Sequence, residues 1–157
     1  MLIDKGLISG MVMQRDAKSL SSQLFSGSCS SSGNVIATVA KGGKPLKGLK
    51  GIVAGKAAKG SFKGVLKGIP AGGPYDIELS VGSEKLKIRN VLVGDLWMLA
   101  GQSNMQGCGD LVNNLKPVKE VRAYYMDERW DTAKDPIHNI HSAKAPIHRA
   151  LLGPESQ

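Results

Sequence analysis

The chain has 157 residues, which is enough for one ordinary domain or for a small domain and part of another. Lys and Arg number 21 against 13 Asp and Glu, so the formal net charge is +8, and 41% of the residues are apolar. No apolar run approaches the roughly 18–20 residues of a membrane span. Asp4 and Lys5 interrupt the first apolar stretch, which argues against a signal peptide. We therefore expect a folded chain without a membrane partner, in a compartment that the sequence leaves open.

The first 90 residues carry short strand-like runs separated by Gly, Ser and Lys. Residues 35–39 are mostly β-branched. Residues 77–81 and 85–89 alternate apolar with polar side chains on either side of Gly82-Ser83, which is the clearest hairpin signal in the chain. We predict that residues 1–90 form a small antiparallel β-sandwich.

The pattern changes after Asn90. Residues 91–100 are almost continuously apolar, which is typical of a strand covered on both faces in a parallel sheet. A second strand-like run covers residues 121–126, and the rest of the chain shows no clear period. These features predict the first part of an α/β domain over residues 91–157. Only 67 residues follow Asn90 (157 − 90), so we expect this domain to be truncated.

The best candidate for chemistry is the segment Gly101-Gln102-Ser103-Asn104-Met105, at the carboxyl end of the predicted strand. Reacting groups in open α/β sheets gather at the carboxyl ends of strands. A serine hydroxyl placed there is exposed, and the backbone N–H of Ser103 could donate to an oxyanion. Because residue 105 is Met, the segment is not the Gly-x-Ser-x-Gly elbow of common hydrolases. A serine in an ordinary polar turn is the alternative.

Residues 93–97 (Val-Gly-Asp-Leu-Trp), followed by residues 101–105, resemble the first block of the sialate O-acetylesterase family, an SGNH-type group of serine hydrolases. Residues 11–16, 71–75 and 121–125 are similar to further segments of that family. The resemblance implies a β-sandwich followed by an SGNH hydrolase-like, flavodoxin-like α/β domain. It also implies an O-acetylated carbohydrate as substrate, no cofactor, and a family that is commonly extracytoplasmic.

The resemblance further implies roles for individual residues. Ser103 would be the nucleophile, its N–H an oxyanion donor, and we place Gln102 and Asn104 in substrate binding. A serine needs a base, which the family supplies from an Asp-x-x-His pair near its C-terminus. Asp135 and His138 have this spacing and are the candidate orienter and base. They follow Ser103 by only 35 residues (138 − 103), so a loop on the sugar side is the alternative.

Other polar and aromatic residues have weaker signals. Trp130 is a candidate for stacking on a sugar, with local packing as the alternative. Asp95 lies within the apolar run, so we expect its carboxylate to be buried and bonded, bracing the serine segment. The spacing of Asp135, His138 and His141 fits zinc sites poorly, and we predict no metal.

Eight lysines lie between residues 41 and 67, with no acidic residue among them. Such a density could bind nucleic acid or an anionic polysaccharide. The segment has no Arg and a single aromatic residue, Phe62, which argues against nucleic acid. The alternative is that these lysines lie on the exposed faces of edge strands and oppose aggregation.

Together these observations predict the N-terminal part of a serine carbohydrate esterase that removes O-acetyl groups from sialic acid or other sugars. We expect the isolated chain to be inactive, because the base and most oxyanion donors are missing. The alternative function is a non-catalytic β-sandwich that binds carbohydrate or polyanions. The sugar and the oligomeric state stay open.

Overall fold

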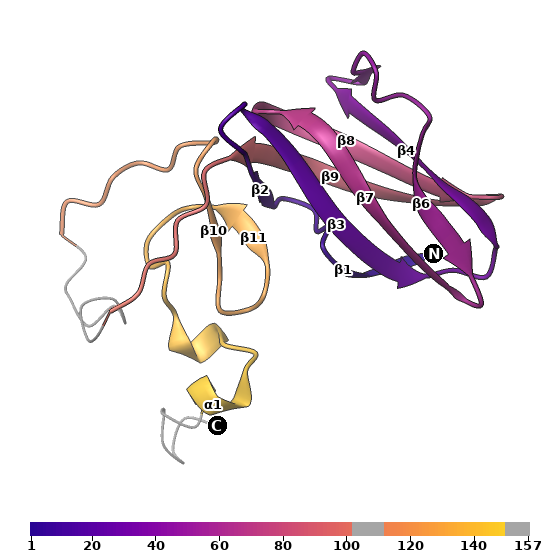
Figure 1. The fold of residues 1–157 in the computed structure, drawn as a ribbon. Coiled ribbons are helices and arrows are strands. Elements are labelled where there is room, and N and C mark those ends of the chain that lie inside the picture. Colours follow the sequence, from indigo (N-terminus) through magenta and orange to yellow (C-terminus); the bar gives the residue numbers. More distant parts are fainter. Residues whose placement is uncertain (102–111, 150–157) are drawn as a thin grey trace. The chain divides into compact units, whose positions relative to one another are not determined.

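A single β-sheet forms most of the first of two compact units, Met1–Leu96 and Trp97–Gln157. The structure is a computed structural model that describes residues 1–101 and 112–149. Among these residues the sheet has nine strands in the order β1-β3-β7-β6-β4-β8-β9-β2, with β5 beside β4 (Figure 1). The strands are β1 (Leu2–Lys5), β2 (Val12–Gln14), β3 (Leu20–Ser28), β4 (Gly33–Lys41), β5 (Lys44–Pro45), β6 (Ile52–Ala58), β7 (Ser61–Pro70), β8 (Gly72–Val81) and β9 (Glu84–Gly94).

The predicted hairpin is confirmed as the antiparallel pair β8–β9. Val81 pairs with Glu84, and Ile77 pairs with Ile88, so Gly82 and Ser83 form the turn. Along β8 the apolar side chains are buried and the polar ones between them are more exposed, as the period of two predicts. The β-branched run at residues 35–39 is likewise confirmed as part of β4.

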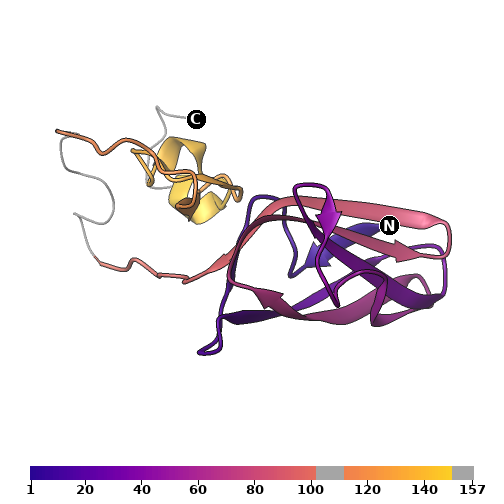
Figure 2. The ribbon, with the colours of Figure 1, turned by 90° about the horizontal axis from the view of Figure 1, so that it is seen from above.

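The two halves of the predicted β-sandwich are joined by hydrogen bonds into one sheet. β6 pairs antiparallel with both β4 and β7, so the β3–β7 half continues through β6 into the β4–β8–β9 half. The sheet curls around its interior like half a barrel (Figure 2). The predicted β-sandwich over residues 1–90 is therefore wrong. A curled sheet and a sandwich bury the same alternating side chains, so the sequence pattern did not distinguish them.

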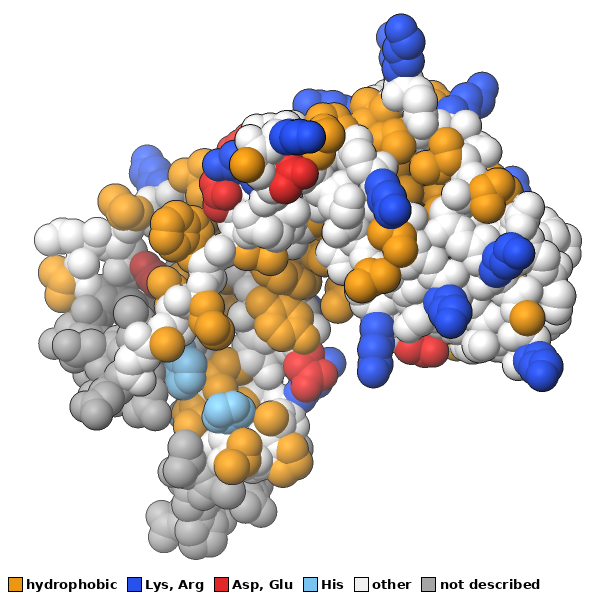
Figure 3. Space-filling view, viewed as in Figure 1, with side chains coloured by type: hydrophobic (Ala, Val, Ile, Leu, Met, Phe, Trp, Pro, Cys, Tyr) orange, Lys and Arg blue, Asp and Glu red, His pale blue; other side chains and the backbone are white. Residues whose placement is uncertain are grey.

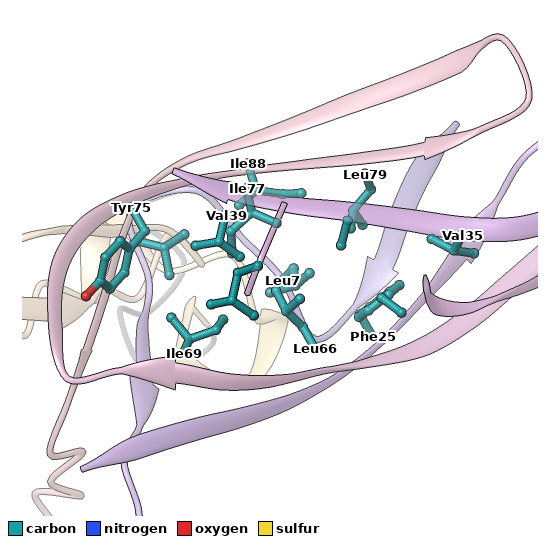
Figure 4. Packing of buried hydrophobic residues seen from close by; sticks show 14 of the residues in the cluster. Leu7, Phe25, Val35, Val39, Leu66, Ile69, Tyr75, Ile77, Leu79 and Ile88 are labelled. Atoms are coloured by element: carbon teal, nitrogen blue, oxygen red, sulfur yellow. The ribbon is translucent and has the colours of Figure 1, made fainter. Parts of the chain in front are cut away.

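The hydrophobic core lies inside the curl. Ile77 and Leu79 of β8 face Leu66 and Ile69 of β7 across the interior (Figure 4). Leu7, from the connection between β1 and β2, fills the space between them and is 2% exposed. Burial of each such side chain is worth about 1.5–3 kcal/mol relative to exposure, so this layer is the main source of stability in the first unit.

The predicted α/β domain is also wrong. Residues 91–94 complete β9, and residues 95–100 form no strand. Trp97 and Met98 are 85% and 92% exposed, whereas the prediction required both faces of this run to be covered. An apolar run indicates that its side chains need to be buried, but it does not show which segment of the protein buries them. Whether residues 1–90 and 91–157 act as separate domains stays a prediction.

In the second unit the described residues form a short antiparallel hairpin instead of a parallel crossover. Arg122 pairs with Thr132, and Tyr124 pairs with Trp130. Within residues 1–101 and 112–149 the structure contains no helix long and apolar enough to cross a membrane. The elements of this unit are β10 (Arg122–Tyr124), β11 (Trp130–Thr132), the 3-10 helix η1 (Ile140–Ser142) and the single turn α1 (Pro146–Arg149).

Glycines allow β6 and β7 to approach each other closely. Gly55 of β6 lies directly opposite Gly64 of β7. A Cβ atom on Gly64 would clash with the carbonyl oxygen of Ala54 and would lie 2.5 Å from the ring of Phe25. A Cβ on Gly94 of β9 would instead lie 3.9 Å from Val12, which is an ordinary contact. The absence of a side chain at residue 64 is therefore a packing requirement.

The carboxylate of Glu84 joins the start of β9 to the N-terminus and to the loop between β3 and β4. Its Oε2 accepts a hydrogen bond from the Met1 ammonium at 2.8 Å, and its Oε1 accepts from the backbone N–H groups of Ser30 and Ser31 at 2.9 and 2.7 Å. The hydrogen bond from the ammonium, followed by that from the Ser31 amide, lowers the pKa of Glu84 to about 2. The fold thus binds this carboxyl group in its ionised form.

We expect Gly64→Ala to lower the free energy of unfolding by about 1–3 kcal/mol, because the added methyl group overpacks the contact with Phe25. Urea unfolding followed by circular dichroism measures the change. Gly94→Ala is the matched control and should change stability by less than about 0.5 kcal/mol. Equal stability of the Gly64→Ala variant and the wild type would contradict this packing argument.

We expect the stabilisation by Glu84 to depend on pH. Its pKa lies at about 2 in the folded chain, below the ordinary value of 4.5, so the ionised carboxylate stabilises the fold above pH 4.5. That contribution is lost as the pH falls from 4.5 towards 2. In thermal melts the Tm gap between the wild type and Glu84→Gln should be constant above about pH 5 and should shrink below it. A gap that stays constant down to the folded pKa would refute this linkage.

Candidate functional site

Two segments that are about 80 residues apart in the sequence meet at the end of β9. β2 pairs in parallel with the last residues of β9, with Met13 opposite Val93 and Gln14 opposite Gly94. β2 lies within the segment at residues 11–16, and β9 ends inside the segment at residues 93–97, and both segments carry the family resemblance. The fold therefore brings the two together at the point where the chain leaves the sheet and continues towards Ser103.

Gln14, the last residue of β2, and Arg15, which follows it, hold the chain just after this point. The N–H of Leu96 donates to Gln14 Oε1 at 2.8 Å, and the N–H of Arg15 donates to the Gly94 carbonyl at 2.9 Å. The Arg15 guanidinium donates from Nη2 to Asp95 Oδ2 at 3.0 Å. These three bonds fix the direction of residues 94–96 relative to the sheet.

The carboxylate of Asp95 is paired, as predicted, but it is not buried. Its side chain is 47% exposed and that of Arg15 is 37% exposed. An exposed ion pair of this kind contributes only about 0–1 kcal/mol to stability. Its main effect is therefore on the direction of the chain, because the guanidinium of the residue after β2 limits where the backbone at Asp95 can turn.

Gln102, Ser103 and Asn104 lie outside the residues that the structure describes. Their roles as substrate-binding groups and nucleophile stay predictions. Along the chain, Ser103 follows Gly94 by nine residues (103 − 94). The β2–β9 junction therefore sets the starting point of the segment that carries the serine.

Asp135 and His138 lie in the irregular segment after β11, where Asp135 is exposed and His138 is half-buried. Among the described residues, no hydrogen bond or ion pair connects the two side chains. A base in a serine triad is normally held by the carboxylate that orients it. Asp135 and His138 are thus close in the sequence, but the structure shows no such contact between their side chains.

Trp130 packs within the hairpin of the second unit. Its ring lies 5.5 Å from that of Tyr124 between centroids, with an interplanar angle of 49°. Trp130 is half-buried and Tyr124 is 50% exposed. This contact supports the alternative of local packing, while stacking of Trp130 on a sugar stays a prediction.

Sequence reasoning missed a charged cluster at the turn of this hairpin. Arg129 donates from Nε to Asp127 Oδ2 at 2.7 Å and from Nη1 to Asp131 Oδ2, and its guanidinium lies 5.4 Å from the centre of the Tyr125 ring. The bond to Asp127, ahead of the one to Asp131, raises the pKa of Arg129. The alternation Asp-x-Arg-x-Asp at residues 127–131 was the available signal, because it places one cation two residues from each of two carboxylates.

No group of three or more His, Cys, Asp and Glu side chains in residues 1–101 and 112–149 could hold a metal ion. The backbone N–H of His141 donates to Asn139 Oδ1 at 3.1 Å, so that Asn139 caps the short 3-10 helix η1. His141 therefore has a local structural context that does not involve Asp135 or His138.

Comparisons with known proteins add to this geometry. Residues 93–156 match the family of carbohydrate esterases described as sialic acid-specific acetylesterases. Among solved structures the chain is similar to a carbohydrate acetylesterase from Xanthomonas citri, at 34% sequence identity and a TM-score of 0.42. The match covers 64% of this chain and 20% of that one, so the chain spans about a fifth of the length of this protein. The comparison with curated proteins found no match.

The matched region begins at Val93 of β9 and includes the candidate serine segment, Asp135, His138 and Trp130. It therefore contains every site residue that the sequence predicted. This match supports the predicted resemblance of the chain to the sialate O-acetylesterase-like carbohydrate esterases, which its Gly-Gln-Ser-Asn-Met segment carries.

Proposed function

We propose that this chain is part of a serine carbohydrate esterase that removes O-acetyl groups from sialic acid or another sugar. The observation that carries the proposal is the Gly-Gln-Ser-Asn-Met segment at residues 101–105, inside the family match over residues 93–156. The description of the family names sialic acid, and the Xanthomonas citri protein is described as a carbohydrate acetylesterase. Both descriptions support an O-acetylated sugar as substrate.

In the proposed reaction Ser103 Oγ attacks the carbonyl carbon of the acetyl group while a base takes its proton. The backbone N–H of Ser103 donates to the oxyanion of the tetrahedral intermediate. The C–O bond to the sugar then breaks, the base returns the proton to the sugar oxygen, and an acetyl-enzyme remains. Attack by water on this ester, assisted by the same base, releases acetate and restores the serine.

The β2–β9 junction supports this role by orienting the chain ahead of the serine. Gln14 and Arg15 hold residues 94–96, and the β-sheet holds Gln14, the neighbour of Arg15. A nucleophile gains reactivity from being held in one geometry relative to its substrate. We therefore assign Arg15 and Asp95 as positioning residues, which act through the backbone and not on the substrate.

We further propose that the isolated chain has little or no turnover. Leu96, Trp97, Met98 and Leu99 are 46–92% exposed, which is an unusual environment for a run of apolar side chains that leads into a catalytic segment. Such a run needs partners that the described residues do not provide. Without them, the base and the further oxyanion donors that a serine esterase needs are not assembled around Ser103.

We expect a chimera to recover the activity. In it, this chain replaces the matching fifth of the Xanthomonas citri acetylesterase, and hydrolysis of 4-nitrophenyl acetate is measured. Ser103→Ala should lower kcat of the chimera by about three orders of magnitude, because the nucleophile is lost. Ser83→Ala, at the exposed turn between β8 and β9, is the matched control and should leave kcat unchanged.

Two outcomes would contradict these assignments. A folded, active chimera that is insensitive to Ser103→Ala would remove Ser103 as the nucleophile. Hydrolysis by the isolated chain that disappears with Ser103→Ala would contradict its proposed inactivity. Circular dichroism of each variant separates a loss of chemistry from a loss of fold.

His138→Ala tests the local candidate for the base in the same chimera. We expect kcat to fall by less than about tenfold, because no carboxylate hydrogen bond holds the His138 ring among the described residues. Asp135→Ala should then have a similarly small effect. A loss as large as that of Ser103→Ala, together with a shifted lower limb of the pH–rate profile, would identify His138 as the base.

A further inference from the structure

A long stretch of sequence without acidic residues forms neighbouring strands of the sheet. Between Asp16 and Asp76 the chain contains no Asp, Glu, Arg or His, so every charged side chain there is a lysine. This stretch supplies β3, β4, β5, β6 and β7, of which β3, β7, β6 and β4 lie side by side in that order. The fold therefore gathers one sign of charge on adjacent strands.

Two of these lysines lie directly opposite each other in a row that crosses four strands. Lys63 of β7 pairs with Lys56 of β6, and both side chains are exposed. Ser26 of β3 extends the row on one side, and Asn34 of β4 extends it on the other. Opposed residues on one face have Cβ atoms roughly 4.5–5.5 Å apart, and like charges at that separation destabilise a sheet. This row has a cost in stability that an anion between the two ammonium groups would remove.

Protection of an edge does not explain this pair. The sheet ends at β1 and β2, whereas β6 and β7 lie inside it, each hydrogen-bonded to a strand on either side. Lys56 and Lys63 therefore do not shield an open strand edge, and the prediction of edge lysines is wrong for them. Among the residues that the structure describes, no lysine from 41 to 67 forms an ion pair with a carboxylate.

An apolar spot lies between lysines on the same face. Leu24 of β3 pairs with Val65 of β7, and Leu24 is 70% exposed. Lys63 and Lys67 lie two residues before and after Val65, and Lys67 pairs with Ser22 of β3. At about 3.3 Å per residue, the two lysines are roughly 13 Å apart along β7. The face thus alternates ammonium groups with an apolar surface and serine hydroxyls.

We propose that this lysine face, made of Lys56, Lys63, Lys67, Leu24 and Val65, binds an acidic polysaccharide. Carboxylate or sulfate groups along the polymer would pair with the spaced ammonium groups. The C–H faces of the sugar rings would lie on the apolar spot, and the ring hydroxyls would meet Ser22 and Ser26. Figure 3 shows blue Lys and Arg side chains spaced over the first unit in this view, with fewer red Asp and Glu side chains among them.

The side chains available favour a polysaccharide over nucleic acid. The two aromatic rings of β3 and β7, Phe25 and Phe62, are 3% and 2% exposed and point into the core, so they cannot stack on bases. The stretch has no arginine to form paired hydrogen bonds with guanine or phosphate. Binding by lysine point charges instead suits a flexible polymer whose charges are spaced along the chain.

This inference does not depend on the proposed esterase activity, because it uses strands that carry none of the candidate catalytic residues. Its test measures binding of the 157-residue chain to fluorescein-labelled heparin, which carries sulfates, and to polygalacturonate, which carries carboxylates. Fluorescence anisotropy at several NaCl concentrations gives the Kd and its salt dependence. Neutral dextran is the uncharged control, and the two acidic probes show which anion the face prefers.

The triple variant Lys56→Gln/Lys63→Gln/Lys67→Gln should weaken binding of at least one acidic probe by about tenfold or more near 100 mM NaCl. The matched control, Lys85→Gln/Lys87→Gln/Lys119→Gln, removes the same net charge elsewhere and should weaken it by less than about twofold. Thermal melts confirm that each variant is folded. If the triple variant does not fold, Lys63→Gln alone should still weaken binding by about threefold.

Lys56→Glu adds a readout that a diffuse charge effect would not give. It replaces the opposed lysines with an opposite-charge pair, so the Tm should rise while binding of the acidic probe weakens. The proposal is overturned if neither acidic probe binds the wild type or if the two triple variants lose affinity equally. Tighter binding of duplex DNA or of anionic vesicles through the same three lysines would overturn it as well.

Discussion

The parallel pairing of β2 with β9 is the constraint that holds the chain at residues 94–96, ahead of the candidate serine segment in the sequence. β9 ends at Gly94, and without β2 beside it the residues that follow would leave the sheet with no fixed direction. Gln14 and Arg15 bind the backbone of residues 94–96 and the Asp95 carboxylate. Because β2 precedes β9 by about 80 residues, their pairing is a long-range contact, and the position of residues 94–96 is therefore tied to the stability of the first unit.

That stability comes from the interior of the curled sheet, and it restricts the residues at close contacts. Side chains from β7 and β8 meet across the core, and Gly64 is required where β6 and β7 approach. The outer face of the same strands has no such restriction, since side chains there contact solvent. Residues such as Lys56 and Lys63 can therefore serve binding even at a small cost in stability, and an opposed lysine pair inside a sheet is better explained by a ligand than by packing.

Local features of the fold could be predicted from the sequence, whereas its long-range features could not. The β8–β9 hairpin and β4 follow from alternation and turn residues, which act over a few residues. The pairing of β6 with both β4 and β7, which makes one sheet out of an expected sandwich, leaves no local signal. The prediction of a buried parallel strand at residues 91–100 is wrong for the same reason. Hydrophobicity indicates that these side chains need to be buried, but not which segment buries them. The serine segment was identified by its resemblance to a family, since spacing alone would have favoured an ordinary turn.

The lysine face and the β2–β9 junction belong to different parts of one sheet. In the strand order, β4 and β8 separate β6 from β9, so a polymer on β3, β7 and β6 would not occupy the β2–β9 junction. An esterase that acts on a polymer benefits from holding the chain away from the reacting bond, because the bound polymer raises the local concentration of its acetyl groups. A substrate without negative charge would gain nothing from the lysines. Charge on the substrate is thus the property that links the two regions, and it favours an acidic sugar polymer over a neutral one as the target of the proposed esterase.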